Sequence, residues 1–213
     1  MRISIHQPAY LPWLGYLEKI QNCDKFIFLD TVQFSKNSFD NRNRIPKEND
    51  HSRWLTIPIK HSGLFGQVYT ECHSDNELWK VSHLEIIKQT YGKSINFDKY
   101  FPILQKYYKE LVPDMNLADI DFDLLKFFVD CFEIKTEIIR SSSLKKIHGK
   151  GSDLVLNVCK YFGASEYYSG RMGKDYLLLK DFKDSDIDVI FQEYQPPTMW
   201  SAIHQLFTKG ATL

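Results

Sequence analysis

Hydrophobic and polar positions at the start of the chain follow a strand pattern that changes to a helical one. Arg2 to His6 alternates apolar and polar residues, whereas the apolar residues between Trp13 and Ile20 recur at three- and four-residue spacing. A continuous apolar run from Phe26 then indicates a strand that is buried on both faces. The opening therefore predicts a strand–helix–strand unit with parallel strands.

The rest of the chain predicts a hairpin region, a helical cluster and further strands. The polar segment 31–46 is typical of an exposed loop or an edge hairpin, and the next strand, 54–59, is expected to pair with a strand at 67–72. An N-terminal cap by Ser152 or Asp153 is expected for the helix that ends near residue 161. Further helices are predicted at 77–91, 100–111, 121–132 and 200–207, and further strands at 135–139 and 186–191.

These elements indicate an α/β fold. We expect a Rossmann-like, mostly parallel sheet that opens with a βαβ unit, plus a helical cluster in the second half of the chain. The 213 residues, 43% of them hydrophobic, can form a sizeable core. We predict one domain over residues 1–213, with two small domains as the alternative.

Charge and hydropathy limit the classes of function. The 27 basic and 27 acidic residues balance, so no net field attracts nucleic acid or an anionic membrane. There is no secretory signal pattern, and no apolar run approaches the roughly 20 residues that span a bilayer. The sequence thus predicts a cytoplasmic protein without a membrane span.

The four cysteines are far apart and lack a metal-ligand spacing, so no metal site is predicted. We expect them to be small buried hydrophobes. Cys23 alone lies close to the candidate site in the sequence.

Two residues at predicted strand ends are the candidate catalytic groups. Ligands of parallel α/β sheets bind beyond the carboxyl ends of the strands, and His6 and Asp30 follow the first and second strands. A histidine there can act as a general base or proton donor, and Asp30 can orient it or charge the site. The alternative is that His6 is only a hydrogen-bonded strand end.

Further polar residues are candidates for substrate binding. The paired N–H donors of an arginine guanidinium fit phosphate or carboxylate oxygens, and side-chain amides can bind sugar hydroxyls. The alternatives are a solvated turn around residues 31–46 and a plain tight turn around the glycines near residue 170. The candidates are Gln7, Tyr10, Lys19, Gln33, Lys36, Asn41, Arg42, Arg44, Ser169, Arg171 and Tyr176.

Three motifs connect the chain with a known family. They are His6-Gln-Pro-x-Tyr-Leu-Pro-Trp-Leu-Gly-Tyr16, Phe-Leu-Asp30-x-Val-Gln-Phe-Ser-Lys36 and Asn41-Arg-Asn-Arg44, and with later matches they cover nearly the whole chain. The sequence resembles the WbqC-like proteins of bacterial O-antigen and related surface-glycan gene clusters. For some members the resemblance implies acylation or aminoacylation of an amino sugar. His204 stands where the family usually has an aspartate, which points to altered chemistry or to a dimer contact.

The resemblance and the residues together predict a transferase. It would attach an acyl or aminoacyl group, such as glycyl, to the amine of a nucleotide-linked amino sugar. His6 would remove the amine proton. Arg42, Arg44 and Arg171 would hold phosphates, and Gln7, Tyr10 and Asn41 would orient the sugar.

Other readings of the same residues remain open. One is a non-catalytic protein that binds a nucleotide sugar or a pathway partner. Another is an ATP-dependent adenylate-forming enzyme, because the opening is similar to nucleotidylyltransferase-like folds. A third is a hydrolase or acyltransferase that uses Cys23 with His6. The expected ligands are a nucleotide-linked amino sugar with ATP or another activated acyl donor, and a homodimer is one possible assembly.

Overall fold

The computed structural model describes residues 1–47, 51–60 and 66–213, and the chain forms two compact units. The first unit comprises Met1–Gln7, Glu18–Leu29 and Lys135–Gln195. The second comprises Pro8–Leu17, Asp30–Ile134 and Pro196–Leu213. The single domain over residues 1–213 stays a prediction.

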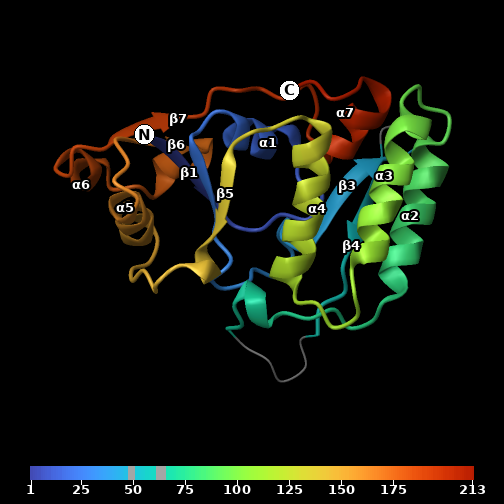
Figure 1. The fold of residues 1–213 in the computed structure, drawn as a ribbon, viewed down its shortest axis with the longest axis horizontal. Helices are drawn as coiled ribbons and strands as arrows, with labels where there is room; N and C mark the ends of the chain where they lie inside the picture. Colours follow the sequence, from blue (N-terminus) through green and yellow to red (C-terminus); the bar gives the residue numbers. More distant parts are fainter. Residues whose placement is uncertain (48–50, 61–65) are drawn as a thin grey trace. The chain divides into compact units, whose positions relative to one another are not determined.

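A five-stranded sheet forms the centre of the first unit, and each pair of neighbouring strands in it is parallel. The strands in spatial order are β5 (Glu137–Arg140), β2 (Lys25–Phe28), β1 (Arg2–His6), β6 (Glu166–Ser169) and β7 (Asp188–Phe191). The α/β fold is confirmed, and so is the opening βαβ unit, in which α1 (Leu14–Gln21) connects β1 to β2 (Figure 1).

The strand order reverses beside β1. From β1 the chain builds outward through β2 to β5 and then returns to the other side of β1, where it forms β6 and β7. This is the Rossmann type of strand order, and the point of reversal between β1 and β6 is where such sheets bind ligands.

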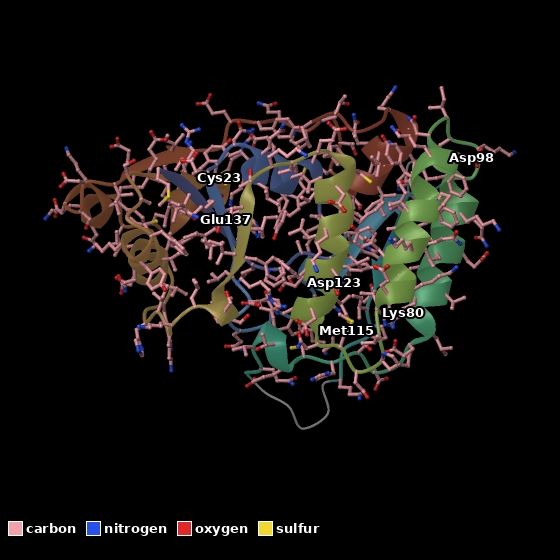
Figure 2. All side chains as sticks on the ribbon, viewed as in Figure 1. Cys23, Lys80, Asp98, Met115, Asp123 and Glu137 are labelled. Atoms are coloured by element: carbon pink, nitrogen blue, oxygen red, sulfur yellow. The ribbon has the colours of Figure 1, made fainter. Side chains whose placement is uncertain are left out.

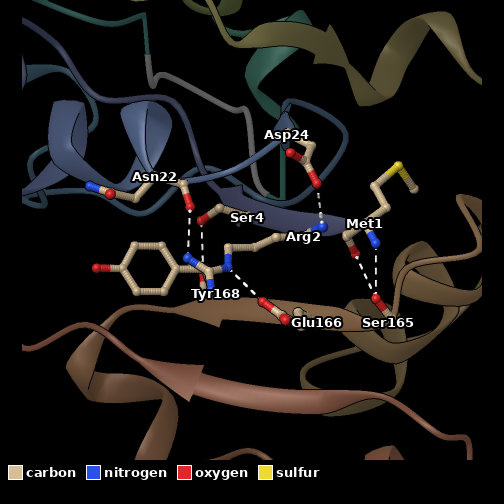
Figure 3. A network of polar contacts seen from close by, with 8 residues as sticks. All are labelled: Met1, Arg2, Ser4, Asn22, Asp24, Ser165, Glu166 and Tyr168. Carbon is tan, nitrogen blue, oxygen red and sulfur yellow. Dashed lines mark hydrogen bonds and ion pairs between the residues drawn. The ribbon is translucent and has the colours of Figure 1, made fainter.

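The amino ends of β1 and β6 are fastened by a polar network (Figure 3). The Arg2 guanidinium donates to Glu166 at 2.7 Å, and the Arg2 backbone N–H donates to the Asp24 carboxylate at 2.7 Å. Direct pairing of the two strands covers Arg2↔Glu166 and Ile3↔Tyr167. The backbone pairing of the two strands is thus confined to their amino ends, and beyond it the Ser4 side chain contacts β6.

Two details of the first unit differ from the sequence prediction. The N-cap of α5 (Ser152–Tyr161) is Gly151, at φ +52°, and the Ser152 hydroxyl accepts a hydrogen bond from the Leu178 N–H at 2.9 Å instead of capping the helix. The strand β6 and the short helix α6 (Leu179–Lys183) were not predicted. Elements of four and five residues are too short to show a periodicity.

The second unit contains an antiparallel hairpin and a helical cluster. The hairpin consists of β3 (Arg42–Pro46) and β4 (Ser52–Thr56). The helices are α2 (Leu78–Tyr91), α3 (Phe97–Glu110), α4 (Leu117–Cys131) and α7 (Ala202–Thr208), and α2, α3 and α4 lie side by side (Figure 1). All four predicted helices are confirmed, although α3 and α4 begin three and four residues earlier than expected.

The expected strand at 67–72 is wrong. Tyr69–Glu71 is a 3₁₀ helix, and β4 pairs with β3, so the hairpin alternative for the polar segment is correct. Tyr69 and Cys72 are both fully buried at three-residue spacing, which suits a 3₁₀ turn rather than an alternating strand.

Aromatic rings pack against one another between the helices of the second unit, where Figure 2 shows side chains filling the space between the ribbons. Phe97 stacks on Phe101 with ring centroids 4.5 Å apart, and Phe207 of α7 packs edge-on against Phe97 at 5.7 Å. This packing joins the last helix to the helical cluster.

Candidate functional site

The gap between the carboxyl ends of β1 and β6 is the candidate functional site. The pairing of β1 with β2 continues to His6↔Phe28, but its pairing with β6 stops at Ile3↔Tyr167. Beyond that pair the Ser4 hydroxyl donates to the Tyr168 carbonyl at 2.8 Å. The gap therefore lies at the point where the strand order reverses.

Lys19 of α1 places its amine at this gap. The His6 carbonyl faces β2, where it accepts from the Leu29 N–H at 2.8 Å. Because backbone groups alternate along a strand, the Ile5 carbonyl faces the β6 side. It accepts a hydrogen bond from Lys19 Nζ at 3.1 Å. Gly170, just after β6, lies next to the amine: a Cβ built on Gly170 would lie 3.9 Å from Lys19 Nζ, which is van der Waals contact.

The Lys19 ammonium is buried without a counter-ion. Only 2% of the residue is exposed, and it forms no ion pair within the described part of the chain. Burial lowers its pKa from 10.5 to about 8, although Cys23 and Glu18 oppose the shift. An ammonium that is desolvated and unpaired is costly, so the site favours an anionic ligand.

His6 is a neutral imidazole beside this ammonium. Burial and the charge of Lys19 lower its pKa to about 3, against a smaller opposing effect of its hydrogen bond to Gln7. In that bond Nδ1 donates to the Gln7 carbonyl at 3.0 Å, which makes Nε2 the proton-accepting atom. His6, Gln7 and Lys19 thus lie together in the first unit, whereas Tyr10 and Asp30, which were expected beside them, belong to the second unit.

Glu18 is a residue of this region that the sequence reasoning missed. The Tyr168 hydroxyl donates to its two carboxylate oxygens at 2.9 and 3.1 Å, and the Gln192 amide donates to the same group. These bonds engage the carboxylate, which forms no ion pair with Lys19 although its charge acts to raise the pKa of that lysine. The partners come from β6 and from the segment after β7, so no local sequence signal could reveal them.

The other three predicted residues of the first unit surround the 3₁₀ helix Arg171–Asp175. Ser169 is 1% exposed, and its hydroxyl donates to the Gly170 carbonyl at 3.1 Å. Arg171 donates to the carbonyls of Glu193 and Tyr194 at 3.0 Å each. The phenol of Tyr176 lies close enough to that of Tyr167 to influence its pKa, which burial raises. Their contacts stabilise this loop, and their binding roles stay predictions.

The remaining candidates belong to the second unit. The Tyr10 hydroxyl is fully buried and hydrogen-bonded to His83 Nδ1 at 2.7 Å and to the Tyr108 hydroxyl. Asn41 is buried and donates to the Ile57 carbonyl at 2.7 Å. Asp30 is fully buried, Gln33 and Lys36 are exposed, and Arg42 and Arg44 lie on the hairpin. A joint action of His6 with Asp30 stays a prediction.

The thiol of Cys23 is poorly suited to nucleophilic chemistry. It donates to the Ile20 carbonyl at 3.3 Å, and burial raises its pKa to about 12. A reactive cysteine needs the opposite shift. This finding disfavours the mechanism that pairs Cys23 with His6.

Within residues 1–47, 51–60 and 66–213, none of the helices is both long and apolar enough to cross a membrane. In the same residues, no group of three or more His, Cys, Asp or Glu side chains is arranged to hold a metal ion.

Comparisons with known proteins place the chain in a family. It is 29% identical over 193 residues to the uncharacterized protein Rv1507c of Mycobacterium tuberculosis (strain ATCC 25618 / H37Rv), covering 91% of this chain and 82% of that protein. No solved structure matches the chain. The profile of the WbqC-like protein family matches residues 7–213, nearly the whole chain. The chain therefore belongs to the WbqC-like protein family.

Proposed function

We propose that the protein is a transferase of surface-glycan synthesis that attaches an acyl or aminoacyl group to the amine of a nucleotide-linked amino sugar. The buried, unpaired ammonium of Lys19 at the point of strand reversal is the observation that carries this proposal. Sheets with this strand order bind nucleotides at that point. A phosphate group is an anion that would compensate the charge of Lys19.

Lys19 would act as the phosphate-binding residue. With a pKa of about 8 it is mostly protonated at neutral pH and can donate to phosphate oxygens. Desolvation strengthens that interaction relative to one at the protein surface. A bound phosphate would also raise the pKa of Lys19, because an opposite charge favours the ammonium form.

His6 would accept the proton that the reaction releases. The sugar amine attacks the carbonyl carbon of the donor, the new N–C bond forms and the bond from carbon to the leaving group breaks. The nitrogen becomes cationic and strongly acidic in this step, so the neutral Nε2 of His6 can take its proton. A phosphate on Lys19 would offset the charge that lowers the pKa of His6 and make it a better base.

The non-catalytic alternative uses the same charge arrangement. A protein that only recognises a nucleotide sugar also needs an anion-binding Lys19, but it needs no proton acceptor. An adenylate-forming enzyme would in addition require ATP. Turnover and ligand preference therefore separate the three functions.

The decisive experiment is a mass-spectrometric assay of nucleotide-linked amino sugars with acyl-coenzyme A donors, or with glycine and ATP. We expect a product heavier by the acyl group, lost in His6→Ala while nucleotide-sugar binding persists. Lys19→Met should lose product formation and binding at the gap, and Lys180→Met, an exposed lysine of the same unit, should behave like the wild type. Binding without product for any donor would favour the non-catalytic function, and full turnover by His6→Ala would exclude His6 as the base.

A further inference from the structure

Two arginines and two tryptophans alternate on the hairpin side of the second unit. The guanidinium carbon of Arg42 lies 4.4 Å from the ring centroid of Trp54. That of Arg44 lies 6.0 Å from Trp54 and 5.5 Å from the ring of Trp200. We call Arg42, Trp54, Arg44 and Trp200 the arginine–tryptophan ladder.

The strand register produces this ladder. Arg44 pairs with Trp54 across the hairpin, and Arg42 lies two residues away on the same face. The opposite face of the hairpin is buried through Asn43, Ile45 and Leu55. The Ser201 N–H donates to the Arg44 carbonyl at 3.0 Å, which fixes the segment that carries Trp200. The ladder is therefore rigid before any ligand binds.

Neither guanidinium has a counter-ion among the residues that the structure describes. The Nε atoms of both arginines are buried and lack a hydrogen-bond partner. Arg42 still donates one hydrogen bond, to the Asn37 carbonyl. Since no carboxylate of the described residues neutralises them, the positive charges of both side chains can be compensated by an anion from outside the chain.

We propose that the ladder binds the diphosphate group of a small molecule. Two unpaired guanidinium groups carry a charge of +2, which a diphosphate ester, with about two negative charges, would neutralise, whereas a sugar carboxylate would neutralise only one. The terminal Nη amino groups of arginine fit phosphate oxygens bidentately, and they are the part of each guanidinium assigned to the ligand because the Nε atoms are buried. Trp54 and Phe39, each 40% exposed, add aromatic surface on which a planar base can stack.

This assignment deepens the phosphate role that the sequence predicts for Arg42 and Arg44, and it depends only on residues of the second unit. It also differs from a solvated turn, since a solvated arginine would direct its donors to water. The ladder provides a binding site whether or not the sheet of the first unit transfers an acyl group.

The test is calorimetric titration with inorganic pyrophosphate in the Lys19→Met background, which removes the anion site of the first unit. We expect Arg44→Gln and Arg42→Gln to weaken pyrophosphate binding at least about tenfold each, the loss of one charge-assisted contact. The matched control is Arg53→Gln, since Arg53 lies on the opposite face of the same hairpin and should leave binding unchanged.

Three results would overturn the proposal: no pyrophosphate binding, an equal loss in Arg53→Gln, or glucuronate binding as tightly as pyrophosphate. Arg42→Lys keeps the positive charge but removes the planar guanidinium that binds phosphate oxygens in pairs. It should therefore bind pyrophosphate several-fold more weakly than the wild type. Melting curves of every variant establish that each is folded. A failure of acyl transfer in the turnover assay would leave these titrations unaffected, so the two proposals can fail separately.

Discussion

Lys19 Nζ donates a hydrogen bond to the Ile5 carbonyl at 3.1 Å, in the gap where β1 and β6 no longer pair. A backbone carbonyl satisfies one donor of the ammonium but none of its charge. Lys19 thus satisfies a strand carbonyl that β6 does not pair, but its own buried charge stays uncompensated. An anionic ligand could compensate that charge.

Because its charge is buried without a counter-ion, Lys19 is expected to destabilise the ligand-free protein. Lys19→Met should raise the free energy of unfolding at pH 7 by about 1–3 kcal/mol, because it replaces a desolvated charge by an apolar chain of similar length. The folded-state pKa of Lys19, about 8, lies below its ordinary value of 10.5. Between these values the unfolded state binds more protons, so wild-type stability gains from a rise in pH there.

Urea denaturation at pH 7, 8 and 9.5 measures both effects. The gain in Lys19→Met should shrink as the pH rises, since the wild-type amine becomes neutral in the fold. A variant that is less stable than the wild type at all three values would contradict this account.

Asp121 on α4 predicts the opposite pH dependence. It is fully buried, and both of its carboxyl oxygens lack a hydrogen-bond partner. Burial, with a smaller contribution from Asp40, raises its pKa well above 3.8, so the fold favours the protonated acid. The folded state then binds more protons above pH 3.8, and stability is lost as the pH rises towards the folded-state pKa.

Asp121→Asn should therefore stabilise the protein at pH 7 by on the order of 1 kcal/mol and should have little effect near pH 4. Thermal melts of the two proteins at pH 4, 5.5 and 7 give the comparison. An equal effect of the substitution at all three values would show that protonation of Asp121 is not involved. The carboxyl group lies near Tyr10, Tyr16, Tyr69 and Tyr108, which are themselves neutral in this range because their pKa values are raised.

Tyr10 is expected to stabilise the second unit rather than to contact substrate. Tyr10→Phe removes a hydroxyl that is hydrogen-bonded to both His83 and Tyr108 and leaves two buried polar groups with one partner fewer. The cost should be about 1–3 kcal/mol in the free energy of unfolding, with ligand affinity unchanged. A loss of nucleotide-sugar affinity in a stable Tyr10→Phe protein would restore the substrate-binding role predicted from the sequence.

Gly173 leaves room for the buried Ser169. A Cβ at Gly173 would overlap the Ser169 hydroxyl, and it would lie 3.2 Å from the Ser169 Cβ and 3.0 Å from a methyl of Leu177. Gly173→Ala should cost about 1–3 kcal/mol by overpacking, and less in a Ser169→Ala background, where the hydroxyl is absent. A double-mutant cycle from urea denaturation provides the coupling energy, and a value of zero would mean that the two residues do not clash.

The sequence predicted those parts of the fold that local patterns determine. The run Phe26–Leu29 and the helical stripes of α2 to α4 are long enough to show their period, and they were placed within a few residues. The pairing of β4 with β3 instead of with 67–72 depends on long-range contacts that no local pattern encodes.

The candidate site could be predicted only in part for the same reason. His6 and Lys19 could be singled out because the end of the first strand and the helix of the βαβ unit are visible in the sequence. The contribution of Glu18 depends on Tyr168 and Gln192, which are about 150 residues or more away. Whether Lys19 has an ion-pair partner is likewise decided only in the folded interior, where Tyr168 and Gln192 engage the neighbouring carboxylate of Glu18.

The central claim is that Lys19 binds the phosphate of a nucleotide-linked amino sugar. Calorimetric titration of three proteins with such a ligand tests it most directly: the otherwise unchanged chain, Lys19→Met and Lys180→Met, each also carrying Arg42→Gln and Arg44→Gln so that the arginine–tryptophan ladder does not contribute. We predict saturable binding by the first and by Lys180→Met, and an affinity at least about a hundredfold weaker in Lys19→Met, since a buried charged contact contributes several kcal/mol. Equal affinity of all three proteins would contradict the assignment of Lys19 and of the gap between β1 and β6.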